Sequence, residues 1–289
     1  MNIIGHIENR EKLKNVVASG KIGHAYLFVG KSGIGKKEVA LEFAKNIMCP
    51  NSVDGKACMS CEVCKTFGNN ADLSIIQPDK NIIKVDAIRN FETEVYLKPT
   101  MSLRKCFIIN DADMMNESAQ NALLKILEEP PLYATIILVA SNKEKLLGTI
   151  KSRVVEMKFL ALTKEEIKEI VGSEIDDEII EFSRGSVEKT LSLSNENYIN
   201  LANELVKAFE TKDFLTINKK IEEIKSDKIL KANISAILES IILVCYKNLK
   251  TNIEKYTYII EIVDETNKNI SKNANVDLAL DNMIIKICF

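Results

Sequence analysis

The sequence predicts an α/β domain built on a parallel sheet, followed by a region made of helices alone. Three observations lead to this fold class. A glycine-containing loop stands between a strand-like and a helix-like segment, strand and helix signals alternate as far as Phe159, and no strand signal follows that residue. Such alternation is typical of a parallel sheet with helices on both faces. At 289 residues, each part is long enough to bury its own core.

The first strand and helix flank the glycine loop. Ala25–Val29 is a short apolar run that stops at Gly30, which predicts a buried parallel strand. Lys37–Ala44 has the apolar spacing of a helix with charged residues on its outer face. A strand, a glycine loop and a helix in this order are the context in which a phosphate-binding loop is found.

The loop itself, Gly30–Lys37, matches the phosphate-binding pattern G-x-x-x-x-G-K-[ST] except at its last position. In such a loop backbone N–H groups cradle the phosphates, the lysine reaches the terminal phosphates, and the final hydroxyl holds Mg²⁺. Lys37 cannot replace that hydroxyl, because an ammonium group has donors and no acceptor. We therefore expect a degenerate loop that binds nucleotide weakly or not at all. Its candidate nucleotide-binding residues are Gly30, Gly33, Gly35 and Lys36.

The next elements continue the alternation. Asp86 resembles the N-cap of a helix running towards Tyr96, and Ser118–Leu127 predicts a helix halted by Pro130 and Pro131. Three further short apolar runs predict buried strands at Leu73–Ile76, Cys106–Asn110 and Thr135–Ala140.

Helical signals alone follow Phe159. Thr163–Glu166 forms a capping box that opens a helix, and Gly185-Ser186 marks a break before another. From about Asn197 one helical pattern follows another. We therefore predict three domains: the α/β domain at 1–159, a small helical lid domain at 160–195, and a larger all-helical domain at 196–289.

Composition narrows the class of protein. A formal net charge of −2 argues against binding nucleic acid through bulk charge. Met1–Arg10 has no apolar core, so we expect no signal peptide. The apolar run Ile234–Cys245 is interrupted by Glu239 and is too short to span a bilayer, so we expect a buried helix and no membrane partner. Seven cysteines without a secretion signal indicate a reducing compartment, and hence a cytoplasmic protein.

Four cysteines form a cluster with the spacing C-x8-C-x2-C-x2-C in a polar loop: Cys49, Cys58, Cys61 and Cys64. Four thiolates at this spacing predict a closed tetrahedral Zn²⁺ site, which is structural because no coordination position stays open. The alternative is a set of free thiols, which leaves four cysteines in an exposed loop without a role. The other cysteines stand in apolar contexts and are expected in the core: Cys106, Cys245 and Cys288.

The positions that should organise catalysis are altered. An ATPase with this loop needs a carboxylate at the end of a strand to organise Mg²⁺, and then a glutamate to activate water. Asn110 stands at the first position and carries no charge, and Asp111 stands at the second with a shorter side chain. Asp111 and Asp113 are equally well explained as solvated loop carboxylates. We therefore expect no intrinsic ATPase activity.

One segment carries a resemblance to a known family. Asn121–Pro131 is very similar to the NALLKxLEEPP signature of the clamp-loader AAA+ subunits of bacterial DNA polymerase III. The spacing to Ser152-Arg153 also fits the Ser-Arg-Cys of that family, although Val154 replaces the cysteine. The cysteine module behind the loop is another mark of its bacterial members. The resemblance spans about residues 3–191 and extends more loosely to the C-terminus.

The resemblance implies an α/β P-loop AAA+ domain with a zinc module, a lid, and a C-terminal helical collar through which subunits assemble. It implies a non-hydrolysing, stator-like subunit of a ring that loads the sliding clamp onto primer–template DNA. Its partners are gamma/tau and delta subunits. Arg153 is then the catalytic residue, acting in trans on the ATP of the neighbouring subunit. An ordinary surface ion pair is the alternative for Arg153.

Two further positions are relevant to nucleotide binding. Motor subunits of the family carry an arginine after Gly-Ser-x in the lid, and here Glu188 stands there and is expected to repel phosphate. Ser141-Asn142, after the last predicted strand, is a candidate polar sensor, although polar residues are common at strand ends. Two other functions stay open: an active ATP-hydrolysing gamma/tau-type motor, and a zinc-bearing DNA-binding protein. The latter lacks the histidines of a C2H2 finger and a following basic helix.

Overall fold

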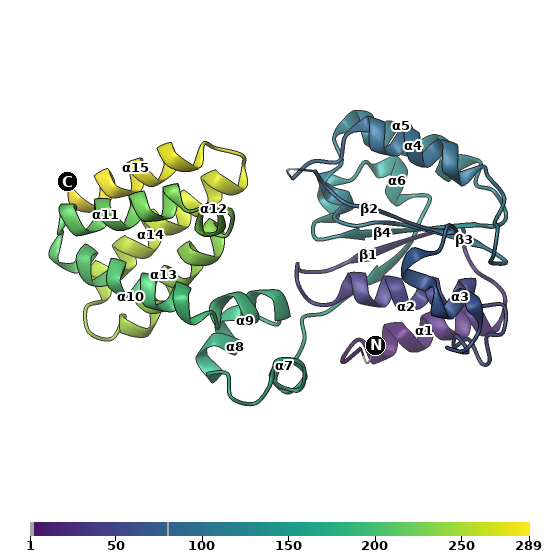
Figure 1. The fold of residues 1–289 in the computed structure, drawn as a ribbon, viewed down its shortest axis with the longest axis horizontal. Coiled ribbons are helices and arrows are strands. Elements are labelled where there is room, and N and C mark those ends of the chain that lie inside the picture. The colour runs from purple at the N-terminus through teal and green to yellow at the C-terminus, as the bar shows by residue number, and fades with distance from the viewer. Residues whose placement is uncertain (1–2, 80) are drawn as a thin grey trace. The chain divides into compact units, whose positions relative to one another are not determined.

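The computed structural model describes residues 3–79 and 81–289, which form two compact units, Met1–Ile170 and Val171–Phe289. The first unit is a five-stranded sheet with helices on both faces, as Figure 1 shows. The second contains only helices in the part that the structure describes. The predicted α/β class and the helical C-terminal region are therefore confirmed. The division into three domains stays a prediction.

The sheet has the strand order β2-β3-β4-β1-β5, and every strand pair is parallel. Four of its strands agree with the predicted segments to within one residue at each end. The fifth, β5, lies on the edge beside β1 and was not predicted. The strands are β1 (Ala25–Val29), β2 (Leu73–Ile76), β3 (Lys105–Ile109), β4 (Ala134–Ala140) and β5 (Val155–Lys158).

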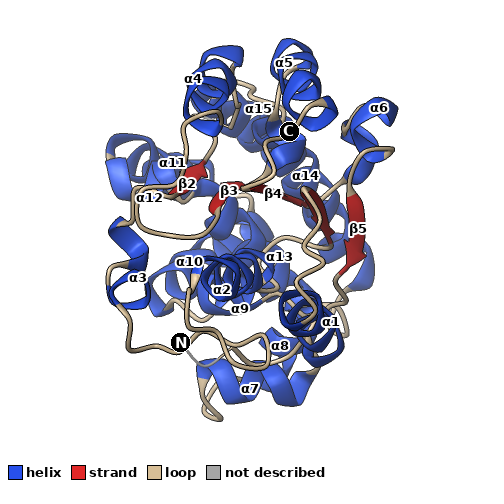
Figure 2. Ribbon diagram, turned by 90° about the vertical axis from the view of Figure 1, so that its right-hand side faces the viewer, coloured by secondary structure: helices blue, strands red, loops and turns tan. Residues whose placement is uncertain are grey.

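Two apolar layers cover the two faces of the sheet. Because successive strand residues point to opposite faces, Leu27 packs towards the helices on one side and Phe28 towards those on the other. Figure 2 shows the two helical layers. One layer contains α4 (Val85–Val95), α5 (Glu117–Glu128) and α6 (Gly148–Lys151), and the other contains α1 (Ile7–Ala18), α2 (Lys36–Met48) and α3 (Glu62–Lys65).

Local signals explain two helix boundaries in this unit. The side chain of Asn116 accepts a hydrogen bond from the N–H of Ala119 and caps α5, which ends before Pro130 as predicted. The capping box also forms: the N–H of Glu166 donates to Thr163 Oγ1 and the N–H of Thr163 donates to Glu166 Oε2, opening α7 (Lys164–Val171). The N-cap predicted at Asp86 is wrong. The cap of α4 is Lys84, and Asp86 lies in the first helical turn.

The second unit is a bundle of amphipathic helices with one large apolar core and a smaller apolar cluster. Ser186 caps one of them after the predicted break at Gly185. The run Ile234–Cys245 lies in a helix with a largely buried face, as predicted. No helix among the described residues is both long and apolar enough to cross a membrane. The helices are α8 (Asp177–Ser183), α9 (Val187–Leu193), α10 (Glu196–Thr211), α11 (Phe214–Ser226), α12 (Lys228–Ala232), α13 (Ile234–Asn248), α14 (Ile253–Ser271) and α15 (Val276–Cys288).

A buried carboxylate holds the segment between α4 and β3. Asp72 is 1% exposed, and its two oxygens accept hydrogen bonds of 2.8 Å from the backbone N–H groups of Thr100, Met101 and Ser102. Burial raises the pKa of Asp72, but these hydrogen bonds lower it more, so the pKa lies below its ordinary value of 3.8. Asp72 therefore stabilises this connection in its ionised form.

We expect Asp72→Asn to destabilise the protein by about 2–3 kcal/mol, because an amide cannot accept all these hydrogen bonds. The depressed pKa gives the sign of the pH dependence. The stabilisation is present above the unfolded pKa and is lost as pH falls through the lower folded pKa. Urea unfolding and hydrogen exchange of the Thr100–Ser102 amides measure both effects. The exposed Asp86→Asn is the control, and unchanged exchange in Asp72→Asn would contradict the assignment.

Candidate functional site

The glycine loop lies where the sequence predicts, between the end of β1 and the start of α2. Gly35 has φ +95°, a left-handed conformation that side-chain-bearing residues rarely adopt, and it directly precedes the helix. The Lys36 ammonium turns into the loop and donates to the carbonyl oxygens of Gly30 at 2.7 Å and Lys31 at 2.5 Å. Lys36 is 5% exposed. The loop therefore has a left-handed glycine directly before the helix and a lysine folded against its own carbonyl oxygens.

Lys37 extends away from this loop. Its ammonium is 3.4 Å from the side-chain oxygen of Gln77, which follows β2. As the sequence predicts, this position offers no acceptor for a metal ion.

Asn110 and Asp111 follow β3 and lie at the same end of the sheet as the loop. The Asn110 amide donates to the Asp111 carboxylate at 2.8 Å. Burial and then the charge of Asp113 raise the pKa of Asp111, while Lys36 and Lys37 oppose the shift. The carboxylate therefore lies close enough to the loop lysines to interact with their charge, but its nearest partner is its own neighbour.

Asp113 has a structural role that the sequence left open. It is 6% exposed, and its oxygens accept hydrogen bonds from the N–H of Ser141 at 3.0 Å and of Asn142 at 3.3 Å. The interpretation as a solvated carboxylate is wrong for Asp113. The side chain of Asn142 accepts a hydrogen bond from the N–H of Glu144 and so caps a short helix, η3 (Lys143–Lys145).

The four clustered cysteines meet as predicted. Their sulfur atoms all lie within 4.8 Å of one another, with Cys49 Sγ 3.6 Å from Cys58 Sγ and 3.9 Å from Cys61 Sγ. A tetrahedral zinc site with Zn–S bonds of about 2.3 Å places its sulfurs about 3.8 Å apart. The backbone N–H of Cys61 also donates to Cys58 Sγ at 3.3 Å. The donor set and its spacing thus fit Zn²⁺, with Cys64 as the fourth ligand.

The thiols differ in acidity. Hydrogen bonds from Ser60, through its side chain and then its backbone, lower the pKa of Cys58 to about 5. Burial raises the pKa of Cys64 to about 12. Thiolates are the form that binds metal, so a bound cation has to supply the charge that keeps Cys64 deprotonated at neutral pH.

The cysteine loop packs directly on the helices below the sheet. Gly55 has φ +74°, and a Cβ there would lie 2.0 Å from the carbonyl oxygen of Lys14 in α1. The N–H of Ala57 donates to the side chain of Asn46 in α2 at 2.9 Å. Cys49 itself is the C-cap of α2. A metal held by this loop would therefore fasten it to both α1 and α2.

The remaining cysteines only partly match the predicted core positions. Cys106 and Cys245 are buried, as predicted, whereas Cys288 is half-buried near the end of the chain. Burial raises the pKa of both buried thiols, so they are less reactive than an exposed cysteine.

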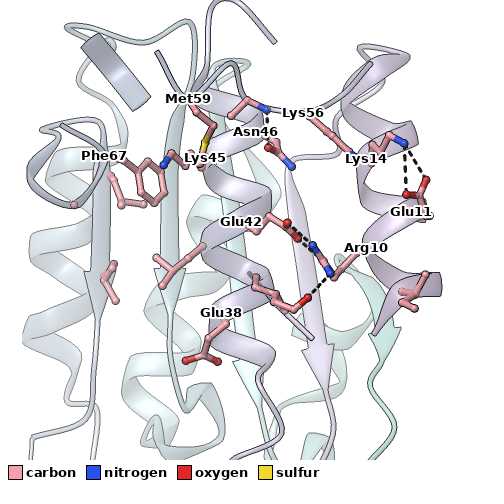
Figure 3. A pocket seen from close by; sticks show the side chains of 17 residues that line it. Arg10, Glu11, Lys14, Glu38, Glu42, Lys45, Asn46, Lys56, Met59 and Phe67 are labelled. Atoms are coloured by element: carbon pink, nitrogen blue, oxygen red, sulfur yellow. Dashed lines mark hydrogen bonds and ion pairs between the residues drawn. The ribbon is translucent and has the colours of Figure 1, made fainter. Parts of the chain in front are cut away.

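A hollow of about 580 Å³ lies beside α2, where α1, the cysteine loop and β2 supply its lining (Figure 3). Arg10 and Glu42 form an ion pair of 2.7 Å in it, and the Lys45 ammonium lies 5.5 Å from the centre of the Phe67 ring. None of Gly30–Lys37 lines this hollow. It is therefore separate from the phosphate-binding loop, and no sequence motif predicted it.

Arg153 lies at the end of the sheet where the strands begin, whereas the glycine loop lies at the end where they finish. It follows α6 and precedes β5, and the ring of His24, just before β1, donates from Nε2 to the Arg153 carbonyl oxygen at 3.1 Å. The glycine loop begins after the far end of β1. Since a strand rises about 3.3 Å per residue, β1 separates the two sites by on the order of 16 Å. The structure therefore does not bring Arg153 to its own phosphate-binding loop.

The Arg153 guanidinium contacts a residue that the sequence did not single out. Its Nη2 lies 2.9 Å from Glu128 Oε1, at the end of α5. Its Nη1 donates to the carbonyl oxygen of Thr149 at 2.9 Å and to Ser152 Oγ at 3.2 Å. Glu128 belongs to the Leu-Glu-Glu-Pro-Pro segment, so the motif could have pointed to it. Its pairing with Arg153, which is distant in sequence, is visible only in the fold.

The chain is similar in sequence to known proteins. The family model described as "DNA polymerase III, delta subunit" matches residues 5–163. The chain is 32% identical over 219 residues to DNA polymerase III subunit gamma of Buchnera aphidicola subsp. Schizaphis graminum, covering 70% of this chain and 60% of that protein. It is 38% identical over 161 residues to subunit delta' of Bacillus subtilis, covering 54% of this chain and 48% of that protein.

A solved structure has the same fold. A gamma subunit-related protein from Thermotoga maritima superimposes with a TM-score of 0.61 at 22% identity, covering 96% of this chain and 98% of that one. The alignments with the two curated relatives span 60% and 48% of the lengths of those proteins.

Proposed function

Because the chain belongs to the DNA polymerase III clamp-loader family, we propose that it is a delta-prime-like subunit that does not hydrolyse ATP and assists a neighbour that does. The observation that carries this proposal is the separation of Arg153 from the chain's own glycine loop across the sheet. An arginine at that end of the sheet is useful to phosphate chemistry only when another subunit presents its nucleotide there. In trans it would stabilise the charge that develops on the transferred phosphoryl group.

The altered loop supports the absence of hydrolysis. Lys37 provides no metal-binding hydroxyl, and Asn110 provides no charge to organise Mg²⁺. Asp111 is hydrogen-bonded to Asn110 and is shorter than the glutamate that usually activates water. Glu188 in the second unit adds a negative charge at the position where motor subunits carry a nucleotide-contacting arginine. Nucleotide binding at this loop is therefore weak or absent.

Zinc would have a structural role in this protein. Cys49, Cys58, Cys61 and Cys64 would hold one Zn²⁺ with no open coordination position, so the ion would neither bind substrate nor activate water. Its effect would be to fasten the loop between α2 and α3 to the rest of the first unit.

Assembly would occur through the helical part. Residues 160–195 would form the lid, and 196–289 would pack with sister subunits as a collar. The partners would be the gamma/tau and delta subunits, and the assembled complex would load the sliding clamp onto primer–template DNA. Support comes from family membership and from the all-helical structure of the second unit.

An active gamma/tau-type motor is the second candidate. The gamma relative of Buchnera matches a larger share of this chain than the delta' relative does. Lys36 and the loop glycines are also in place. This reading requires that the lost hydroxyl and carboxylate be compensated by other groups.

Nucleotide binding by the purified chain separates the two candidates. We expect no ATP hydrolysis and only weak binding that does not depend on Mg²⁺, because no group at Lys37 or Asn110 holds the metal. Calorimetric titration with ATP, with and without Mg²⁺, and a phosphate-release assay make the measurement. Tight Mg²⁺-dependent binding with turnover would favour the motor.

A further inference from the structure

Arg153 is held at both its backbone and its side chain by residues from three separate segments. His24 donates to its carbonyl oxygen, Glu128 pairs with Nη2, and the carbonyl oxygen of Thr149 accepts from Nη1. The side chains of Arg153 and Glu128 are 35% and 51% exposed, so the guanidinium is accessible. Within residues 3–79 and 81–289, its Nε–H makes no hydrogen bond.

We infer that Glu128 is a positioning residue for the Arg153 finger, an inference that rests on the proposed function. The carboxylate and the Thr149 carbonyl oxygen engage different nitrogens of the guanidinium and so restrict the plane of the fork. Nε–H and a second Nη2 proton then remain to donate to the phosphate of a neighbouring subunit. Two parallel donors of this kind suit bidentate recognition of phosphate.

The physical basis is preorganisation. A free arginine side chain has many rotamers, and a phosphate that binds one of them must first select it. The ion pair with Glu128 restricts the rotamers of Arg153 before the neighbouring subunit binds. The guanidinium is then already oriented to stabilise the transition state. An exposed ion pair adds little to folding stability. Glu128 can therefore be changed without unfolding the domain, and its effect falls on the geometry of Arg153.

This arrangement also joins two motifs that lie far apart in sequence. Glu128 closes the Leu-Glu-Glu-Pro-Pro helix, α5, and Arg153 follows the next helix, α6. Strand β4 lies between them in the chain. The connection from β4 through α6 to β5 then returns the chain to the end of the sheet at which β4 began. The ion pair therefore links the end of α5 to the segment that precedes β5.

The test uses the reconstituted clamp-loader complex carrying Glu128→Gln in this subunit. We expect the single-turnover rate constant at the ATP site served by Arg153 to fall about tenfold. The ATP concentration that gives half of the maximal rate should stay nearly unchanged, because substrate is bound by the other subunit. Glu128→Asp should recover part of the rate. In an Arg153→Ala background, Glu128→Gln should cause no further loss, since the two residues act through one group. The neighbouring exposed Glu129→Gln is the matched control.

A second readout needs only the isolated chain. Arginines are few in this sequence (Arg10, Arg89, Arg104, Arg153 and Arg184), so the Nε–H resonance of Arg153 can be assigned by substitution. We expect Glu128→Gln to increase the mobility of that group, while Glu129→Gln leaves it unchanged.

The outcomes separate this inference from the function on which it rests. An unchanged or increased single-turnover rate in Glu128→Gln, with Arg153→Ala impaired, overturns the positioning role alone. Normal mobility of the Arg153 side chain in Glu128→Gln also overturns it. If Arg153→Ala has no effect on the complex, both the finger and its positioning residue are wrong.

Discussion

Replacing Arg153 by alanine is expected to lower the rate of hydrolysis at the neighbouring ATP site by on the order of 10³-fold, at the lower end of the range for arginines supplied in trans. The guanidinium is charged at every physiological pH, and its fork matches the oxygens of the transferred phosphoryl group. Removing it leaves the developing charge without a donor. The proper measurement is single-turnover hydrolysis by the reconstituted complex on primed DNA, since other sites of the ring would mask the loss in steady state.

The fold should survive this substitution. Arg153 is partly exposed, and surface ion pairs contribute about 1 kcal/mol or less to stability. We expect the isolated Arg153→Ala chain to keep its thermal midpoint and to assemble normally. Arg153→Lys is an informative second variant of this chain, because it keeps the positive charge and loses the planar guanidinium fork. The exposed Arg89→Ala serves as a control for arginine loss elsewhere. Unchanged single-turnover rates in Arg153→Ala would refute the trans assignment.

Replacing Cys61 by serine is expected to remove the metal and to loosen the loop between α2 and α3. Structural zinc contributes an apparent free energy of about 10–16 kcal/mol in small zinc-binding peptides, and three thiolates with one hydroxyl bind it far less well. Because the loop is attached to α2 through Cys49 and Asn46, the change should reach the helices under the sheet. Metal analysis of the purified variant measures the loss directly. Hydrogen exchange over Cys49–Cys64 measures the loosening.

Cys288→Ser is the matched control for this experiment. Cys288 is half-buried and lies outside the cluster, so its variant should retain the metal of the unaltered chain. Full zinc content in Cys61→Ser would contradict a site made of four thiolates. Removing zinc from the unaltered chain with a chelator should reproduce the increased exchange over the same residues.

The sequence by itself determined the features that depend on short segments. The central strands are nearly continuous apolar runs because both of their faces are buried, so β1, β3 and β4 are visible in the sequence. The cysteine cluster follows from the spacing of its ligands, and the altered loop from a single motif. In each case neighbouring residues carry the whole signal.

Other elements depend on contacts that no short segment contains. β5 is a four-residue edge strand with a largely exposed surface, and it is ordered by pairing with β1. α1 has as many charged as apolar residues and was not predicted from the sequence, yet it packs along α2. Asp72 and Asp113 likewise have little local signal, and their importance comes from the backbone N–H groups that they meet.

Only the tertiary structure decided how the candidate functional groups are distributed. The sequence contains the glycine loop, the Glu-Glu-Pro-Pro segment and Ser152-Arg153, but not their arrangement. The parallel crossovers bring Glu128, Arg153 and His24 to the end of the sheet where the strands begin, and they leave the glycine loop at the opposite end. The reason is physical: every strand of a parallel sheet runs from the same end of the sheet to the other. A loop residue therefore lies at one end if it precedes its strand and at the other end if it follows it. Residues distant in sequence therefore meet at one end, while Arg153 and the glycine loop are kept apart.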